Sequence, residues 1–204
     1  MKNSQTNHIS FYYNSDLRSS TPTDESIIAA KDILYALSSV STKDIICELS
    51  KKTETEVFSA STIPQFSSLD DCFESVNKLI RSGLDGVSFA RMGYFLRTNH
   101  RKKGADCKYG ENHSKCAGLM GLCRIQNGVW RNPYSYAYES LDDATKIIIR
   151  PKLCLGIGLI RGFFVNGQSE QYIQSAMSCL SESTQLRRKS NIKTLIETVK
   201  QDLV

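Results

Sequence analysis

Residues 109–131 read YGENHSKCAGLMGLCRIQNGVWR and decide which fold we expect for the middle of the chain. The first half repeats apolar residues at a helical spacing and predicts a helix over 109–120, which ends at Gly121. An Asn-Gly pair at 127–128 then lies between two short apolar runs, a pattern typical of a type I′ turn. The stretch therefore predicts a helix followed by a β-hairpin over 123–131.

Two more helices are expected just before this stretch, over 69–82 and 88–96. Ser68 has a hydroxyl that can cap the first of them, and Gly83 follows its last apolar position. Three helices followed by a hairpin is the order of a winged helix-turn-helix, whose third helix enters the DNA major groove. We therefore expect a winged helix over 67–142.

The fold class expected for the whole chain is α+β and mostly α. An N-terminal helical region with a polar arm (1–66) would precede the winged helix, and a C-terminal helical or second winged-helix unit (143–204) would follow it. Further helices are expected over 21–39 (capped by Thr21), 42–51, 151–164, 169–180 and 184–200 (capped by Ser183 or Thr184), with a strand through Tyr134, Tyr136 and Tyr138 and a strand or loop over 53–68.

Positive charge is concentrated in the same middle segment. The chain has a net charge of +5, but residues 81–131 alone hold 10 basic and 3 acidic side chains. A positive block between acidic and near-neutral segments favours one face that meets a polyanion. The candidate DNA contacts here are Arg101, Lys102, Lys103, Lys108, Tyr109, Asn112, His113, Lys115, Arg124 and Arg131, with Ser114 also expected to project outward.

The last expected helix carries a second basic group. Arg187, Arg188 and Lys189 fall in its first turns, where cations oppose the helix dipole. An anion that docks there would explain this placement, and long basic side chains that extend into water are the alternative.

Segment 104–200, with its GADCKYGENHSKCAGLMGL core and its LSESTQLRRKSNIKTLI ending, resembles the tandem winged-helix DNA-recognition modules of restriction–modification and phage-defence proteins. The resemblance implies that Tyr109, Asn112, His113 and Lys115 belong to a first reading helix. It also implies a second reading helix with Thr184, Arg187 and Arg188. The chain carries no recognisable nuclease cassette beside these modules, so the resemblance does not extend to cleavage.

The expected function is sequence-specific recognition of double-stranded DNA, as a transcriptional regulator or as the recognition component of a restriction or antiviral defence system. The alternatives are a non-catalytic adaptor and a nuclease with a degenerate site. We expect no catalysis by the chain alone, no cofactor and no metal, although Cys107, His113, Cys116 and Cys123 could in principle ligate zinc. A homodimer or partner protein would contact residues 1–66.

Seven singly spaced cysteines argue against a disulfide framework and favour a reducing, cytoplasmic location. The longest apolar stretch, 153–165, is short for a membrane span and contains Arg161, so no membrane partner is expected.

Overall fold

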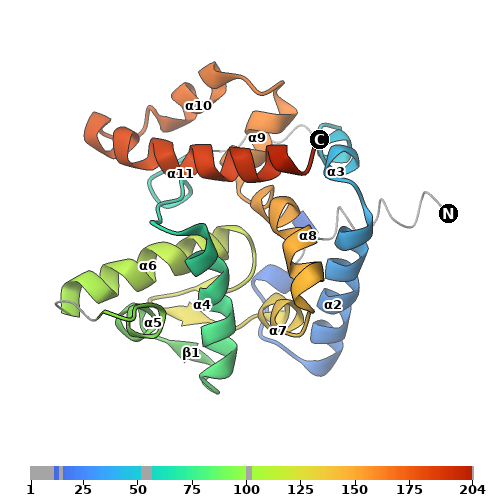
Figure 1. Cartoon of the computed structure of the whole chain (residues 1–204), viewed down its shortest axis with the longest axis vertical. Coiled ribbons are helices and arrows are strands. Elements are labelled where there is room, and N and C mark those ends of the chain that lie inside the picture. Colours follow the sequence, from blue (N-terminus) through green and yellow to red (C-terminus); the bar gives the residue numbers. More distant parts are fainter. Residues whose placement is uncertain (1–11, 14–15, 52–56, 100–102, 204) are drawn as a thin grey trace.

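The computed structural model describes residues 12–13, 16–51, 57–99 and 103–203, and these form a mostly helical α+β fold with a small sheet (Figure 1). This confirms the expected fold class. Most of the polar arm, residues 1–11, lies outside the described residues. The elements are η1 (Asp16–Arg18, a 3-10 helix), α2 (Asp24–Ser39), α3 (Thr42–Leu49), α4 (Leu69–Arg81), β1 (Gly86–Val87), α5 (Phe89–Leu96), α6 (Lys103–Leu119), β2 (Arg124–Ile125), β3 (Val129–Trp130), α7 (Pro133–Glu139), α8 (Asp143–Cys154), α9 (Gly158–Val165), α10 (Glu170–Met177) and α11 (Glu182–Gln201).

The middle segment folds in the order α4, β1, α5, α6, β2, β3. The strands form an antiparallel sheet in the order β1-β3-β2, with Val129 paired to both Val87 and Ile125. The structure confirms the hairpin at 123–131 and the helices expected at 69–82 and 88–96. Ser68 caps the first of these helices, and Ser88 caps the second. The start expected for the third helix is wrong, because α6 begins at Lys103, six residues before Tyr109.

Two glycines, Gly93 and Gly110, allow α5 and α6 to cross so closely that their backbones are in contact. A Cβ built on Gly110 would lie 2.1 Å from the carbonyl oxygen of Phe89, and one on Gly93 would lie 1.8 Å from that of Asp106. Neither position can accept a side chain without moving a backbone. The crossing of these two helices is therefore set by the absence of side chains at its centre.

Three expectations outside this segment are wrong. The strand through Tyr134, Tyr136 and Tyr138 is instead helix α7, because Asn132 and Ser135 form a capping box and Pro133 occupies the first helical position. The helix expected at 151–164 is two helices, α8 and α9, and α8 begins at Asp143. The capping residues also shift: Thr23 caps α2 and Ser181 precedes α11.

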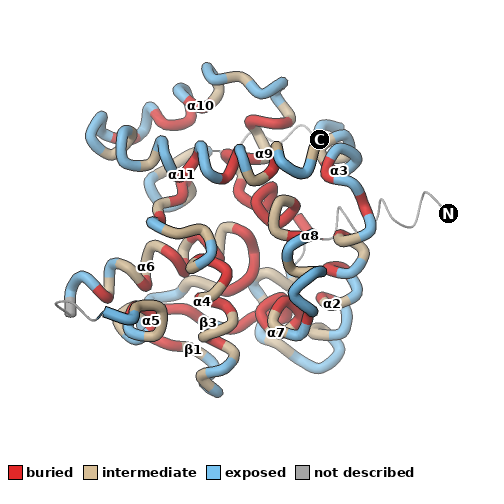
Figure 2. Tube along the Cα trace, in the orientation of Figure 1, coloured by how far each residue is buried: buried red, intermediate tan, exposed pale blue. Residues whose placement is uncertain are grey.

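The core is continuous across the whole described chain. One buried hydrophobic cluster includes Leu34 of α2, Phe73 of α4, Tyr138 of α7 and Leu195 of α11. Figure 2 shows the buried positions gathered toward the middle of the molecule, with exposed positions along the outer sides of α10 and α11. The division at 66 and 142 stays a prediction, since this core draws on all three regions.

Residues 57–68 form a loop without helix or strand, as one of the two sequence expectations allowed, while 52–56 lie outside the described residues. Among the helices that the structure describes, none combines the length and the apolar character needed to cross a bilayer.

Candidate nucleic-acid interface

The outer face of α6 carries polar side chains at helical spacing. Lys108 is exposed, and Asn112 and Lys115 are half-buried on the same face. Glu111 lies between the two lysines, with its carboxylate 2.9 Å from the Lys108 ammonium and 2.6 Å from that of Lys115. Hydrogen bonds from Lys115 and Lys108 lower the pKa of Glu111, so the carboxylate stays ionised. The face therefore holds two cations and one anion, a smaller excess of positive charge than the sequence suggests.

His113 faces inward and organises the start of α4. Its Nε2 atom accepts hydrogen bonds from the backbone N–H groups of Ser67 and Ser68, at 3.2 and 3.3 Å. Its Nδ1 atom donates to the carbonyl oxygen of Tyr109, 2.7 Å away. Only 1% of His113 and none of Ser114 is exposed. The outward projection expected for Ser114 is wrong, and His113 is not available to read a base edge.

Protonation of His113 is expected to destabilise the protein in mild acid. Burial lowers the pKa of His113, so the unfolded chain takes up a proton at a pH where the folded chain does not. The free energy of unfolding should fall as the pH drops from about 6.5 toward the lowered pKa, by up to about 1.4 kcal/mol per pH unit. Urea unfolding across this range measures the slope, and His113→Gln should be less stable at neutral pH but flatter in the window. An equal pH dependence in both proteins would contradict this role for His113.

Tyr109 connects α6 to α4 and to the end of α5. Its hydroxyl donates a hydrogen bond to the carboxylate of Asp71, and the Arg97 guanidinium lies 4.4 Å from its ring centroid. Arg97 in turn forms a 3.0 Å ion pair with Asp106. In this structure Tyr109 makes contacts that hold three helices together, and the DNA contact expected of it stays a prediction.

Arg131 is also turned away from solvent. Only 7% of it is exposed, and its guanidinium donates to the carbonyl oxygens of Leu79 and Ile80, at 3.4 and 3.0 Å. A further 2.6 Å hydrogen bond reaches the Tyr136 hydroxyl. These are two of the last four carbonyls of α4, so Arg131 helps to cap the end of that helix. The expectation that it clamps a DNA groove is corrected accordingly.

The basic group of α11 is split between two sides of the helix. Arg188 donates 2.6 Å hydrogen bonds to the carbonyl oxygens of Ala60 and Ile63, and so holds the loop over α6. Arg187 is exposed and donates a 3.1 Å hydrogen bond to the Thr184 hydroxyl one turn earlier in the same helix. Lys189 is exposed and lines a separate pocket with Glu170 and Glu182. The second reading face expected here is therefore not a uniform cationic surface.

Among the expected contacts, the structure brings four together around α6. Lys108, Asn112, Lys115 and Arg188 line a small pocket of about 60 Å³ that residues 60–65 close. Arg101 and Lys102 lie outside the described residues, as does the side chain of Lys103.

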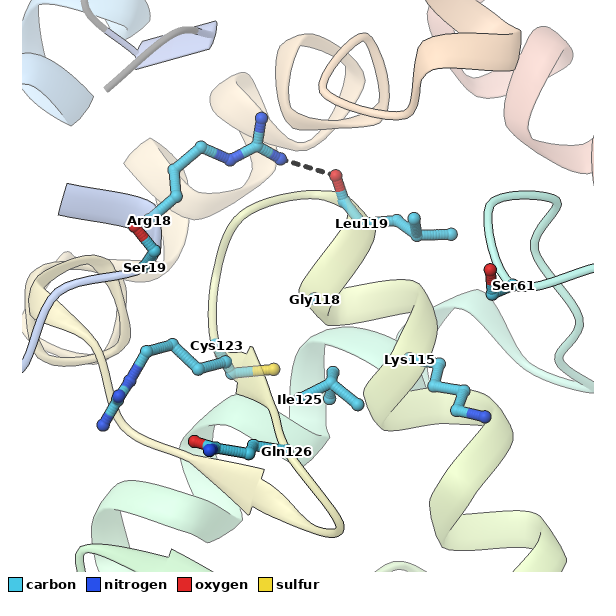
Figure 3. Close-up of a pocket in the computed structure, with 10 residues that line it drawn as sticks. Arg18, Ser19, Ser61, Lys115, Gly118, Leu119, Cys123, Ile125 and Gln126 are labelled. Carbon is cyan, nitrogen blue, oxygen red and sulfur yellow. Dashed lines mark hydrogen bonds between the residues drawn. The ribbon is translucent and has the colours of Figure 1, made fainter. Parts of the chain in front are cut away.

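A larger cavity of about 510 Å³ adjoins this pocket and also contains Lys115 (Figure 3). Arg124 lines it from β2, and Ser61 lines it from the loop. Arg18 lines the same cavity from η1 and donates a 2.6 Å hydrogen bond to the carbonyl oxygen of Leu119, 101 positions later in the sequence. Sequence reasoning missed Arg18 because no local pattern relates it to α6.

Within the described residues, no group of three or more histidine, cysteine or acidic side chains is placed to hold a metal ion. Of the four zinc candidates, His113 already uses both ring nitrogens, and the thiol of Cys123 lies 3.6 Å from the Ser114 carbonyl oxygen. Comparison with protein-family models, with curated proteins and with solved structures found no match.

Proposed function

We propose that this protein recognises double-stranded DNA in a sequence-specific manner, through α6 and the β2–β3 hairpin, as a winged helix. One observation carries the proposal: α4, β1, α5, α6, β2 and β3 follow one another with strand order β1-β3-β2, which places a hairpin beside a helix with a polar outer face. In a winged helix, the corresponding helix enters the major groove. A role in transcription regulation, or in recognition for a restriction or defence system, would use this activity.

The corrected contact set is smaller than the expected one. Lys108 and Lys115 would neutralise DNA phosphates, and Arg124 on the hairpin would contact the sugar–phosphate backbone of the DNA. Asn112 would read a base edge, since an asparagine amide can pair with the N6 and N7 atoms of adenine. Glu111 opposes this binding, because it neutralises part of the positive charge of both lysines.

The test is the salt dependence of duplex binding, measured by fluorescence anisotropy. A Lys108→Ala, Lys115→Ala double variant should lower the affinity and flatten the log–log salt slope by roughly 0.9 per lysine. Glu111→Gln should act in the opposite direction and raise the affinity by roughly fivefold. Lys43→Ala, which removes an exposed lysine of α3, is the matched control and should change neither quantity.

The proposal would be contradicted if the three α6 substitutions changed neither the affinity for duplex DNA nor its salt slope, or if the protein retained no DNA at low salt. Association with a protein that does not depend on salt would then favour the adaptor alternative, and magnesium-dependent cleavage of plasmid would favour the nuclease. Selection of bound duplexes from a random pool tests sequence specificity, which requires a recovered consensus that Asn112→Ala weakens.

A further inference from the structure

The cavity beside the hairpin has a strongly one-sided charge. It lies between η1, the loop at Ser61, the C-terminal half of α6 and strand β2 (Figure 3). Three of the ten residues that line it are cationic, Arg18, Lys115 and Arg124, and none is acidic. A concave surface lined by one sign of charge concentrates ions of the opposite sign.

The two guanidinium groups are held in place without being neutralised. Arg18 donates to the carbonyl oxygen of Leu119, and Nε of Arg124 donates to that of Arg131 at 3.1 Å. Among the described residues, no carboxylate lies within ion-pair distance of either arginine. Backbone carbonyls orient a guanidinium but leave its full charge, so both groups can still attract an anion.

The rest of the lining offers little competition for an anion and some apolar surface. Burial raises the pKa of Cys123 to about 12, so this thiol adds no negative charge at neutral pH. Gly118 and Leu119 of α6 and Ile125 of β2 supply an apolar wall, and the Ile125 side chain lies between the two elements in Figure 3. The volume of about 510 Å³ falls in the range of small-molecule sites.

We infer that this cavity binds an organic anion that has an apolar body and one carboxylate or phosphate group. The apolar body would pack against Leu119 and Ile125, and the anionic group would pair with Arg124, while Arg18 adds positive charge from the opposite side of the cavity. A guanidinium can donate two parallel hydrogen bonds to either anion. Because Lys115 and Arg124 also belong to the proposed DNA contacts, a bound anion would compete with DNA, and this consequence alone rests on the proposed function.

Direct binding is tested first, without DNA, by isothermal titration calorimetry with 2-naphthoate as the probe. The neutral isostere 2-naphthamide has the same apolar body and should bind at least about 10-fold more weakly. Arg124→Met should lower the affinity for 2-naphthoate by about 10-fold or more and leave the affinity for 2-naphthamide unchanged. Lys43→Met is the matched control, because it removes a cation of α3 that lies outside the cavity.

Equal affinity for the two naphthalene probes, no effect of Arg124→Met, or a Kd weaker than about 1 mM for 2-naphthoate would overturn the inference. Arg18→Met provides a second substitution at the far side of the cavity, so that a folding defect in one variant does not decide the result. Inorganic phosphate and AMP as further probes distinguish the carboxylate from the phosphate source of the anion. Displacement of DNA by 2-naphthoate is a separate measurement, and its failure would leave the calorimetric result intact.

Discussion

Gly110→Ala is expected to destabilise the protein by about 3 kcal/mol or more, because the added methyl group would meet backbone rather than side chain. Its Cβ would lie 2.1 Å from the carbonyl oxygen of Phe89 and 2.4 Å from the amide nitrogen of Gly93. Neither atom can rotate away, so α5 and α6 would have to separate. That movement would also displace the outer face of α6 from the hairpin, and with it the proposed DNA contacts.

The matched control is Gly104→Ala in the same helix. A Cβ at Gly104 meets nothing within 4 Å, and the residue is exposed. Alanine favours the helix over glycine, so this variant should be as stable as the parent or up to about 1 kcal/mol more stable. Urea unfolding followed by far-UV circular dichroism measures both variants. Equal midpoints for Gly104→Ala and Gly110→Ala would show that the crossing is not as close as the structure places it.

Asn132→Asp is expected to cost about 3 kcal/mol or more, although the two side chains have almost the same shape. Asn132 is fully buried, and its amide nitrogen donates 2.9 Å hydrogen bonds to the carbonyl oxygens of Arg18 and Gly121. Its side-chain oxygen accepts from the backbone N–H of Ser135, also at 2.9 Å, and caps α7. An aspartate keeps the cap but loses both donors and points a carboxylate oxygen at two carbonyls. The loss should therefore combine the two lost hydrogen bonds with the cost of burying a carboxylate against two carbonyl oxygens.

Asp142→Asn provides the matched control for that exchange. Asp142 caps α8 in the same way, with a 2.8 Å hydrogen bond from the backbone N–H of Thr145, but it is exposed. Asparagine and aspartate cap helices about equally well, so this variant should change stability by less than about 1 kcal/mol. Thermal and urea unfolding of the pair make the comparison. Similar losses in the two variants would mean that the Asn132 amide contributes nothing beyond its cap.

These two sites also support the proposed functional surfaces. Gly93 and Gly110 set the position of α6, and Asn132 ties η1 to the turn after α6 through Arg18 and Gly121. The cavity next to the hairpin has one wall on each of these elements. Its shape therefore depends on residues that do not line it.

Much of the middle segment could be predicted because its signals are local. Ser68 and Ser88 cap α4 and α5, and the Asn127-Gly128 pair forms the turn between β2 and β3. At Asn127 the backbone has a φ of 53°, but Gly128 does not have a positive φ, and three residues separate the paired Ile125 and Val129. The hairpin is therefore confirmed, but the type I′ turn expected for it is wrong, because that turn needs a positive φ at both of its central residues. The error at α7 is instructive, since Asn132, Pro133 and Ser135 are equally local signals for a helix start. The alternation of tyrosines predicts a strand over the same residues, but the cap and the proline favour the helix that forms.

From the sequence alone, then, the helices α4 and α5, the hairpin and the positive charge of residues 81–131 were determined, because caps, periodicity and turn residues act within a few positions. Only the tertiary structure decided which polar side chains face solvent. Histidine and arginine are residue types that bind DNA, yet three of them here form hydrogen bonds with distant backbone groups. The partner of His113 is 46 positions away, that of Arg131 is 52 positions away, and that of Arg188 is 128 positions away. A buried carbonyl or N–H must find a hydrogen-bond partner wherever the fold brings one near, and no local pattern records that choice.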